Sequence, residues 1–136
     1  MTLHISLISL LVNDYDEAID HYVRQLGFLL LEDTLLSSEK RWVVVAPASG
    51  AQTGLLLAKA VGESQTAAIG RQSGGRVFLF LETDDFYGKY NAMSEAGIVF
   101  LETPRHEAYG VVAVFEDKFG NRWDLIERAK PAGPVV

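Results

Sequence analysis

A single acidic residue, Asp124, stands among apolar neighbours in the segment EDKFGNRWDLIE, residues 116–127. The segment predicts a strand end, a tight turn at residues 119–121 and a second strand. A carboxylate on the buried face of a strand needs a partner, because buried charge is costly. Asp124 is therefore a candidate metal ligand, a candidate acid or base, a group that holds a cation or amine of a ligand, or a structural partner of Arg41 or Arg122.

The loop TPRHEAYG, residues 103–110, concentrates further polar chemistry. Functional residues favour loops that are carried by rigid sheets, and Arg105 is suited to a carboxylate or phosphate on a ligand. His106 and Tyr109 are candidates for ligand contact or, together with Asp124, for proton transfer. An ordinary solvated loop is the alternative.

Two halves of the chain present the same order of elements. Each half starts with an apolar strand, continues with an amphipathic helix and ends with three strands rich in Val, Leu and aromatic residues. The helices begin at Asp14 and Asp84 and end at Gly27 and Gly97, and both pairs are seventy residues apart. This repeat predicts a duplicated β-α-β-β-β unit.

The predicted fold class is α+β, with two tandem β-α-β-β-β modules that form curved mixed sheets around a cavity. One module alone would leave a sheet face uncovered, so we expect the modules to pair within the chain or across a dimer. The prediction is one domain at residues 1–128, with a first module at 5–59, a linker rich in Gly, Ser and Gln at 60–75, a second module at 76–128, and a flexible tail at 129–136.

The composition excludes several classes of partner. The formal net charge is −6 and no Lys/Arg run exists to follow a phosphate backbone, so nucleic acid is not expected. No apolar run approaches the ~20 residues of a membrane-spanning helix, so no membrane association is expected. The chain has no cysteine, which excludes disulfides, thiolate metal sites and a cysteine nucleophile. A cytoplasmic location is favoured.

Two segments resemble the vicinal oxygen chelate superfamily, also called the glyoxalase, bleomycin-resistance and extradiol dioxygenase superfamily. DYDEAIDHYVRQLGF, residues 14–28, is similar to its first-helix signature, and FEDKFGNRWDLIE, residues 115–127, is similar to its closing strand-turn-strand. Lys118 and Phe119 depart from this signature, which more often has proline and a small polar residue. The resemblance covers residues 5–128 and implies the fold. It implies less about reaction, because the fold hosts isomerases, dioxygenases, lyases, antibiotic-modifying enzymes and sequestering proteins.

The resemblance also implies where a metal would bind. Metal-dependent members use four ligands, typically two His and two carboxylates, and the matching positions here are Leu7, Leu56, Phe78 and Asp124. A catalytic site needs at least three protein ligands, and one carboxylate among Leu and Phe does not supply them. No cofactor is therefore predicted. The alternative is a divalent metal (Ni, Zn, Mn or Fe) bound through Asp124 and ligands that this matching misplaces.

The three histidines offer no ligand set with a spacing that indicates metal binding. His4 is expected to face away from the cavity, His21 is expected at the solvent edge of the first helix, and His106 could hang over the cavity mouth. The alternative for each is an ordinary surface or hydrogen-bonding role.

Strand alternation from the matched positions predicts the cavity lining. Ser9 shares a face with Leu7, and Phe80 shares a face with Phe78, so the lining is mostly apolar and aromatic, as in small-molecule pockets. Alternatively the phenylalanines fill the barrel and leave no pocket, and Trp42 is either lining or core. The candidate ligand-binding residues are Ser9, Trp42, Phe78, Phe80, Arg105, His106, Tyr109 and Asp124.

The predicted function is metal-independent binding of a small, partly apolar molecule by a glyoxalase/bleomycin-resistance-like protein. The first alternative is a divalent-metal-dependent lyase, isomerase or dioxygenase of the glyoxalase type. The second is a metal-free acid/base enzyme that uses Asp124, His106 or Tyr109. A homodimer is expected, because many relatives implied by the resemblance are dimers and the half-barrels leave strand edges to cover.

Overall fold

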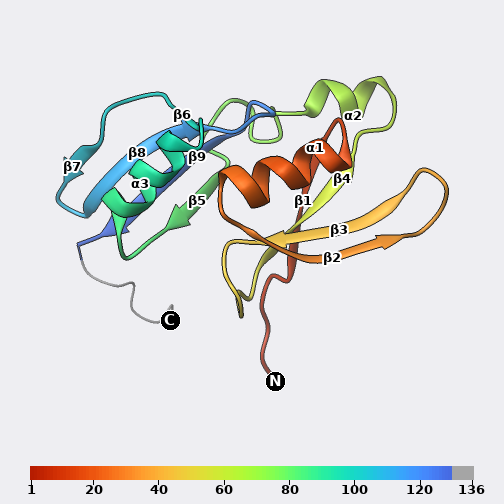
Figure 1. Cartoon of the computed structure of the whole chain (residues 1–136), viewed down its shortest axis with the longest axis horizontal. Coiled ribbons are helices and arrows are strands. Elements are labelled where there is room, and N and C mark those ends of the chain that lie inside the picture. The colour runs from red at the N-terminus through yellow and green to blue at the C-terminus, as the bar shows by residue number, and fades with distance from the viewer. Residues whose placement is uncertain (130–136) are drawn as a thin grey trace. The chain divides into compact units, whose positions relative to one another are not determined.

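The chain folds into two compact units that adjoin in the sequence between Arg71 and Gln72 (Figure 1). The structure, a computed structural model, describes residues 1–129. Each unit contains one mixed sheet, of four strands in the first and five in the second. The α+β class predicted from the sequence is confirmed, and so is the repeated order of strand, helix and further strands.

The first unit follows the predicted order and adds one helix. Its elements are β1 (Leu7–Val12), α1 (Tyr15–Ile19), the π-helix η1 (Asp20–Gln25), β2 (Leu29–Leu35), β3 (Arg41–Ala46), β4 (Gly54–Lys59) and α2 (Gly62–Ala68). The sheet order is β1-β4-β3-β2, with β1 parallel to β4 and the other pairs antiparallel. Helix α2 lies inside the segment 60–75 that the sequence predicted as a linker. The module boundaries themselves stay a prediction.

The first helix begins as predicted and then changes its winding. The side chain of Asp14 accepts a hydrogen bond from the Glu17 backbone N–H at 2.8 Å, which satisfies a donor of the first turn. Further on, the N–H of Leu26 donates to the carbonyl of His21, five residues earlier, at 3.1 Å. His21, expected at the solvent edge, is only 3% exposed, and its Nδ1 lies 2.6 Å from Oε1 of Gln25. That expectation was wrong.

The second unit repeats the order of strand, helix and further strands. Its elements are β5 (Leu79–Glu82), α3 (Phe86–Glu95), β6 (Val99–Phe100), β7 (Arg105–Glu107), β8 (Gly110–Glu116) and β9 (Arg122–Arg128). The sheet order is β5-β9-β8-β6, and β7 pairs with β8. The predicted helix start at Asp84 is one residue early, because Asp85 is the N-cap and accepts from the Gly88 N–H at 3.1 Å.

Each sheet packs one face against its helix, and this is where the core lies. In the second unit the packing is aromatic: Tyr90 of α3 contacts Phe100, which contacts Phe115, which stacks on Trp123 with ring centroids 5.6 Å apart. In the first unit the helix-covered face is aliphatic, with Leu10, Val12, Val43, Val45 and Leu57 all fully buried. Because side chains alternate along a strand, the opposite, helix-free face of each sheet presents the other residues of every strand.

Within residues 1–129, no helix is long and apolar enough to cross a membrane. The predicted tail, apart from its first residue, lies outside the described residues.

Candidate functional site

The helix-free face of the second sheet carries most of the residues predicted for the site. Trp123 and Leu125 of β9 are buried on the helix side, so Asp124 between them lies on the helix-free face. Phe80 of β5 and Val114 of β8 lie directly opposite Asp124 on the two neighbouring strands. Phe80 is 68% exposed. A flat aromatic surface and a carboxylate are thus adjacent on the helix-free face.

Asp124 lacks the partner that a buried carboxylate requires. Its Oδ1 atom is buried and has no hydrogen-bond partner among the described residues. Burial raises the pKa of Asp124 above its ordinary value, the charge of Arg105 opposes this, and the charge of Glu102 adds to it. The structural role proposed from the sequence through Arg41 does not fit, since that guanidinium binds Asp33 at 2.7 Å and Asp16 at 2.9 Å.

Arg105 comes to this face from the short strand β7, which formed within the predicted loop. Its guanidinium contacts Glu102 at 2.7 Å and Glu107 at 3.0 Å, and the side chain of Tyr109 lies beside it. These contacts raise the pKa of Arg105, so it stays charged. The structure therefore brings Arg105 and Tyr109 together, and the charge of Arg105 acts on Asp124.

His106 does not join this group. It follows Arg105 on β7 and so points to the opposite face of the sheet, the side of α3. There its Nε2 lies 2.8 Å from the hydroxyl of Tyr87, and the two rings stack with centroids 6.2 Å apart. Phe78 lies just before β5, is half-buried, and is held by the hydrogen bond from its N–H to the carbonyl of Arg122 at 2.7 Å.

The helix-free face of the first sheet holds the two remaining candidates. Ser9 of β1 lies opposite Leu56 of β4, and Trp42 of β3 lies opposite Thr34 of β2. Ser9 is exposed and Trp42 is half-buried. Trp42 thus lies outside the fully buried core of this unit.

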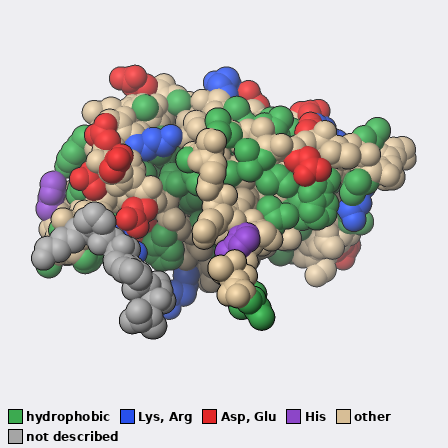
Figure 2. Space-filling view, turned by 90° about the horizontal axis from the view of Figure 1, so that it is seen from below, with side chains coloured by type: hydrophobic (Ala, Val, Ile, Leu, Met, Phe, Trp, Pro, Cys, Tyr) green, Lys and Arg blue, Asp and Glu red, His purple; other side chains and the backbone are tan. Residues whose placement is uncertain are grey.

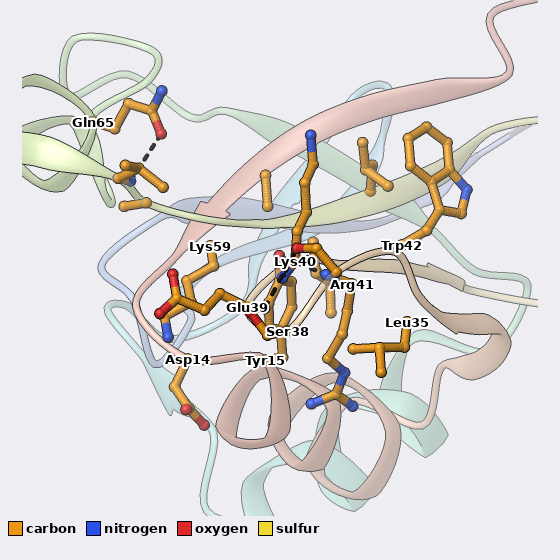
Figure 3. Close-up of a pocket in the computed structure, with 16 residues that line it drawn as sticks. Asp14, Tyr15, Leu35, Ser38, Glu39, Lys40, Arg41, Trp42, Lys59 and Gln65 are labelled. Atoms are coloured by element: carbon orange, nitrogen blue, oxygen red, sulfur yellow. Dashed lines mark hydrogen bonds between the residues drawn. The ribbon is translucent and has the colours of Figure 1, made fainter.

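Trp42 also borders a pocket that the sequence did not reveal (Figure 3). The pocket has a volume of about 810 Å³ and lies where the β2–β3 hairpin meets the end of β4 and the start of α2. Its polar lining includes Lys40, Lys59 and Gln65, none of which was a candidate. The signal available in the sequence was the charged hairpin SSEKR before Trp42, but which residues face it depends on pairing between distant strands.

Comparison with known proteins places the chain in a family. Residues 4–125 match the model of the Glyoxalase/Bleomycin resistance protein/Dioxygenase superfamily. The chain therefore belongs to this superfamily, and the resemblance stated from its sequence signatures is confirmed. An uncharacterized protein of Shewanella frigidimarina (strain NCIMB 400) is 55% identical over 121 residues, which are 88% of this chain and 90% of that relative.

Solved structures share the fold over nearly the whole chain. TnmS3, an antibiotic binding protein from Streptomyces sp. CB03234, is 31% identical with a TM-score of 0.75, over 94% of this chain and 98% of that chain. UcmS2 is 26% identical with a TM-score of 0.80, over 93% of this chain and 98% of that chain.

The residues that the sequence resemblance matches to the metal positions of this family do not fit a metal ion. Leu7, Leu56 and Phe78 have no donor atom in their side chains, so only Asp124 could coordinate a cation. Across the described part of the chain, no group of three or more His, Cys, Asp or Glu side chains is arranged to hold one. Metal chemistry of the glyoxalase type has no donor set at these positions.

Proposed function

We propose that the protein binds a small, partly apolar organic molecule without the use of a metal ion. The observation that carries the proposal is the pair formed by exposed Phe80 and half-buried Asp124 on neighbouring strands, because Oδ1 of Asp124 is buried and has no hydrogen-bond partner among the described residues. Exposed aromatic surface beside a few polar groups is the usual composition of a ligand site.

This pair also defines what the ligand must offer. The face of Phe80 suits a flat, apolar ring. The Oδ1 atom of Asp124 requires a hydrogen-bond donor, such as a hydroxyl or an amine, because a buried acceptor without a partner loses about 1–3 kcal/mol. A ligand with both a flat ring and a donor group would displace water from Phe80 and would also donate a hydrogen bond to Oδ1 of Asp124.

Similarity supports the same class of function. The chain shares 31% identity with TnmS3 over nearly its full length, and TnmS3 is an antibiotic binding protein. Sequestration needs only a shaped surface with a few polar groups, and it makes no demand on the three donor-free metal positions.

The test uses two matched naphthalenes, 2-naphthol with a donor hydroxyl and 2-methoxynaphthalene without one. We expect 2-naphthol to bind more tightly to the ¹⁵N-labelled protein, with shifts of the β5 and β9 amide signals. Phe80→Ala should weaken both compounds, whereas Asp124→Ala should remove the preference for 2-naphthol. Leu101→Ala, which truncates another exposed apolar side chain of the same unit, is the control. Equal affinity of all variants for 2-naphthol would refute the site.

A metal-free acid/base enzyme is the second candidate, and the raised pKa of Asp124 favours it. The two candidates differ in the fate of the ligand. A binding protein returns its ligand unchanged, whereas an enzyme releases a product that mass spectrometry detects. The glyoxalase-type alternative is tested by the metal content per chain after incubation with nickel, manganese, iron and zinc. A near-stoichiometric ion lost in Asp124→Ala would replace our proposal by metal catalysis.

We also propose that the protein is a homodimer, and strand β2 supports this. It is an edge strand of the first sheet, all seven of its residues are exposed, and it carries several leucines (Figure 2). A long apolar edge strand invites pairing with another chain, and antiparallel pairing of two β2 strands would be symmetric. Analytical ultracentrifugation should give a dimer that Leu31→Lys dissociates, whereas a concentration-independent monomer would contradict the proposal.

A further inference from the structure

We propose that the pocket beside Trp42 binds the anionic end of a flat organic molecule, a carboxylate or sulfonate attached to an aromatic ring. The inference rests on the proposed function, small-molecule binding. It adds a second binding site, in the first unit, and a negative charge on the ligand. All residues that line this pocket belong to the first unit.

The size of the pocket suits such a molecule. Its volume of about 810 Å³ falls in the range of roughly 300–1,000 Å³ that small-molecule sites occupy. The lining also contains the apolar residues Leu35, Trp42, Leu56 and Val61. Leu35 and Val61 are strongly exposed, so their apolar surface is in contact with water until a ligand covers it.

The positively charged side chains that line the pocket differ in whether they already form ion pairs. Arg41 is neutralised by Asp33 and Asp16, and it also lies 5.2 Å from the ring centroid of Tyr15. By contrast, the ammonium groups of Lys40 and Lys59 form no ion pair or hydrogen bond with any residue in the described range 1–129. Two cations of this pocket are therefore still available to a ligand.

The two lysines differ in their neighbours, as Figure 3 shows. In this view Lys59 lies on the side of the pocket that also holds Glu39 and Asp14, whose carboxylates would oppose an anion bound on that side. Lys40 points away from these residues, on the side where Trp42 lies. An anion next to Trp42 would thus meet the charge of Lys40 without an opposing carboxylate.

The backbone of Lys40 is held in place by the hairpin. Its N–H donates to Oγ of Ser37 at 3.1 Å, and its carbonyl accepts from the N–H groups of Leu36 and Ser37 at 2.8 and 3.1 Å. The start of the side chain is therefore fixed before a ligand arrives, which reduces the entropy that binding would remove. Trp42, two residues on, is fixed in the ladder between β2 and β3.

The experiment compares two probes of the same shape and opposite charge, 2-naphthoate and 2-naphthylmethylammonium. In ¹⁵N NMR spectra the chain has two indole signals, from Trp42 and Trp123. Trp123 is buried and donates to Oδ2 of Asp117 at 3.0 Å, so it serves as an internal reference. We expect 2-naphthoate to shift the Trp42 signal, assigned with Trp42→Phe, and to bind more tightly than the cationic probe.

Substitutions locate the charge that is responsible. Lys40→Met should weaken 2-naphthoate by about three- to fivefold, the range for a solvent-accessible ion pair, and Lys59→Met should weaken it less. Lys118→Met removes the same charge from the turn before β9, outside the pocket, and should leave the affinity unchanged. An unchanged affinity in Lys40→Met, or equal binding of the two probes, would overturn the inference.

The outcomes also separate this inference from the proposed function. If 2-naphthol shifts the β5 and β9 signals while 2-naphthoate leaves the Trp42 signal unmoved, the anion pocket is wrong and the Phe80–Asp124 site stands. If neither compound shifts any signal, small-molecule binding itself is contradicted.

Discussion

Asp117 and Asp124 lie seven residues apart in one strand-turn-strand segment, and their carboxylates have opposite surroundings. Asp117 is 4% exposed, and it accepts hydrogen bonds from the N–H groups of Phe119 and Asn121, from Nδ2 of Asn121 and from Nε1 of Trp123, the shortest of them 2.9 Å long. Asp124 has an oxygen that is equally hidden from water and has no partner in the described chain.

The two residues differ in whether the fold itself supplies hydrogen-bond donors to the carboxylate, and this distinguishes a structural carboxylate from a candidate binding group. The four donors named above come from the six residues that follow Asp117, so the turn itself solvates this carboxylate. Asp124 faces a sheet surface built by strands that are distant in sequence, and no described residue of that surface donates a hydrogen bond to its Oδ1 atom. A carboxylate that the fold leaves unsatisfied is better placed to serve a ligand than one that the fold already uses.

The largest predicted effect is therefore at Asp117. Asp117→Ala leaves several donors without an acceptor in a buried turn, and we expect it to lower the free energy of unfolding by about 3–5 kcal/mol. Urea denaturation followed by tryptophan fluorescence measures this change. Asp117→Asn keeps one acceptor oxygen and should lose less, and a loss below about 1 kcal/mol in Asp117→Ala would contradict the structural role.

The second prediction is a substitution at Asp124 that raises the free energy of unfolding. Because burial raises the pKa of Asp124, its charged form destabilises the folded state at neutral pH. We expect Asp124→Asn to raise the free energy of unfolding at pH 7 by about 0.5–1 kcal/mol, a modest value because the residue is only half-buried. The same substitution should weaken 2-naphthol. Lower stability at pH 7 would make Asp124 a structural group like Asp117.

The pH dependence of this gain follows from the direction of the shift. The folded state holds the proton of Asp124 to a higher pH than the unfolded state, whose pKa is near 3.8. The favourable contribution of the protonated group is complete below that value and is lost as the pH rises through the folded-state pKa. The advantage of Asp124→Asn should thus be small at pH 3.5 and should grow toward pH 7.

The sequence could predict the features that depend on local patterns. The strand-helix repeat, the Asp14 cap and the superfamily depend on local patterns, and the structure and comparisons confirm them. Alternation along β9 and β5 likewise anticipated that Phe80 and Asp124 share a face. These features follow from residues close together in the chain, where periodicity carries the information.

Features that depend on pairing between distant segments were missed. The loop 103–110 forms β7 against β8, which sends Arg105 and His106 to opposite faces of the sheet. The π-helix turns His21 inward, a change of winding that an α-helical periodicity does not predict. Arg41 pairs with Asp33 across the β2–β3 hairpin rather than with Asp124. For β7 and for Arg41 the deciding contact is set by strand register, which a single sequence specifies weakly.

The smallest predicted effect concerns Asp33, a carboxylate whose partner lies on the surface. A hydrogen bond from Arg41 lowers the pKa of Asp33, so its stabilising contribution is present above the unfolded-state value near 3.8 and is lost as the pH falls through the folded-state pKa. We expect Asp33→Asn to lower the free energy of unfolding by about 0.5 kcal/mol at pH 7, and 1 M NaCl should reduce this loss by screening.

Asp33 and Asp124 belong to one chain and titrate in one experiment, so the stability changes of Asp33→Asn and Asp124→Asn can be compared directly as the pH changes. The loss in Asp33→Asn should shrink toward pH 3, where the gain in Asp124→Asn also disappears. At pH 7 the two substitutions should shift the urea midpoint in opposite directions, and the double variant should show additive shifts because the residues share no partner. Shifts of the same sign would mean that Asp124 has a cationic partner as Asp33 does, and its availability to a ligand would then no longer follow.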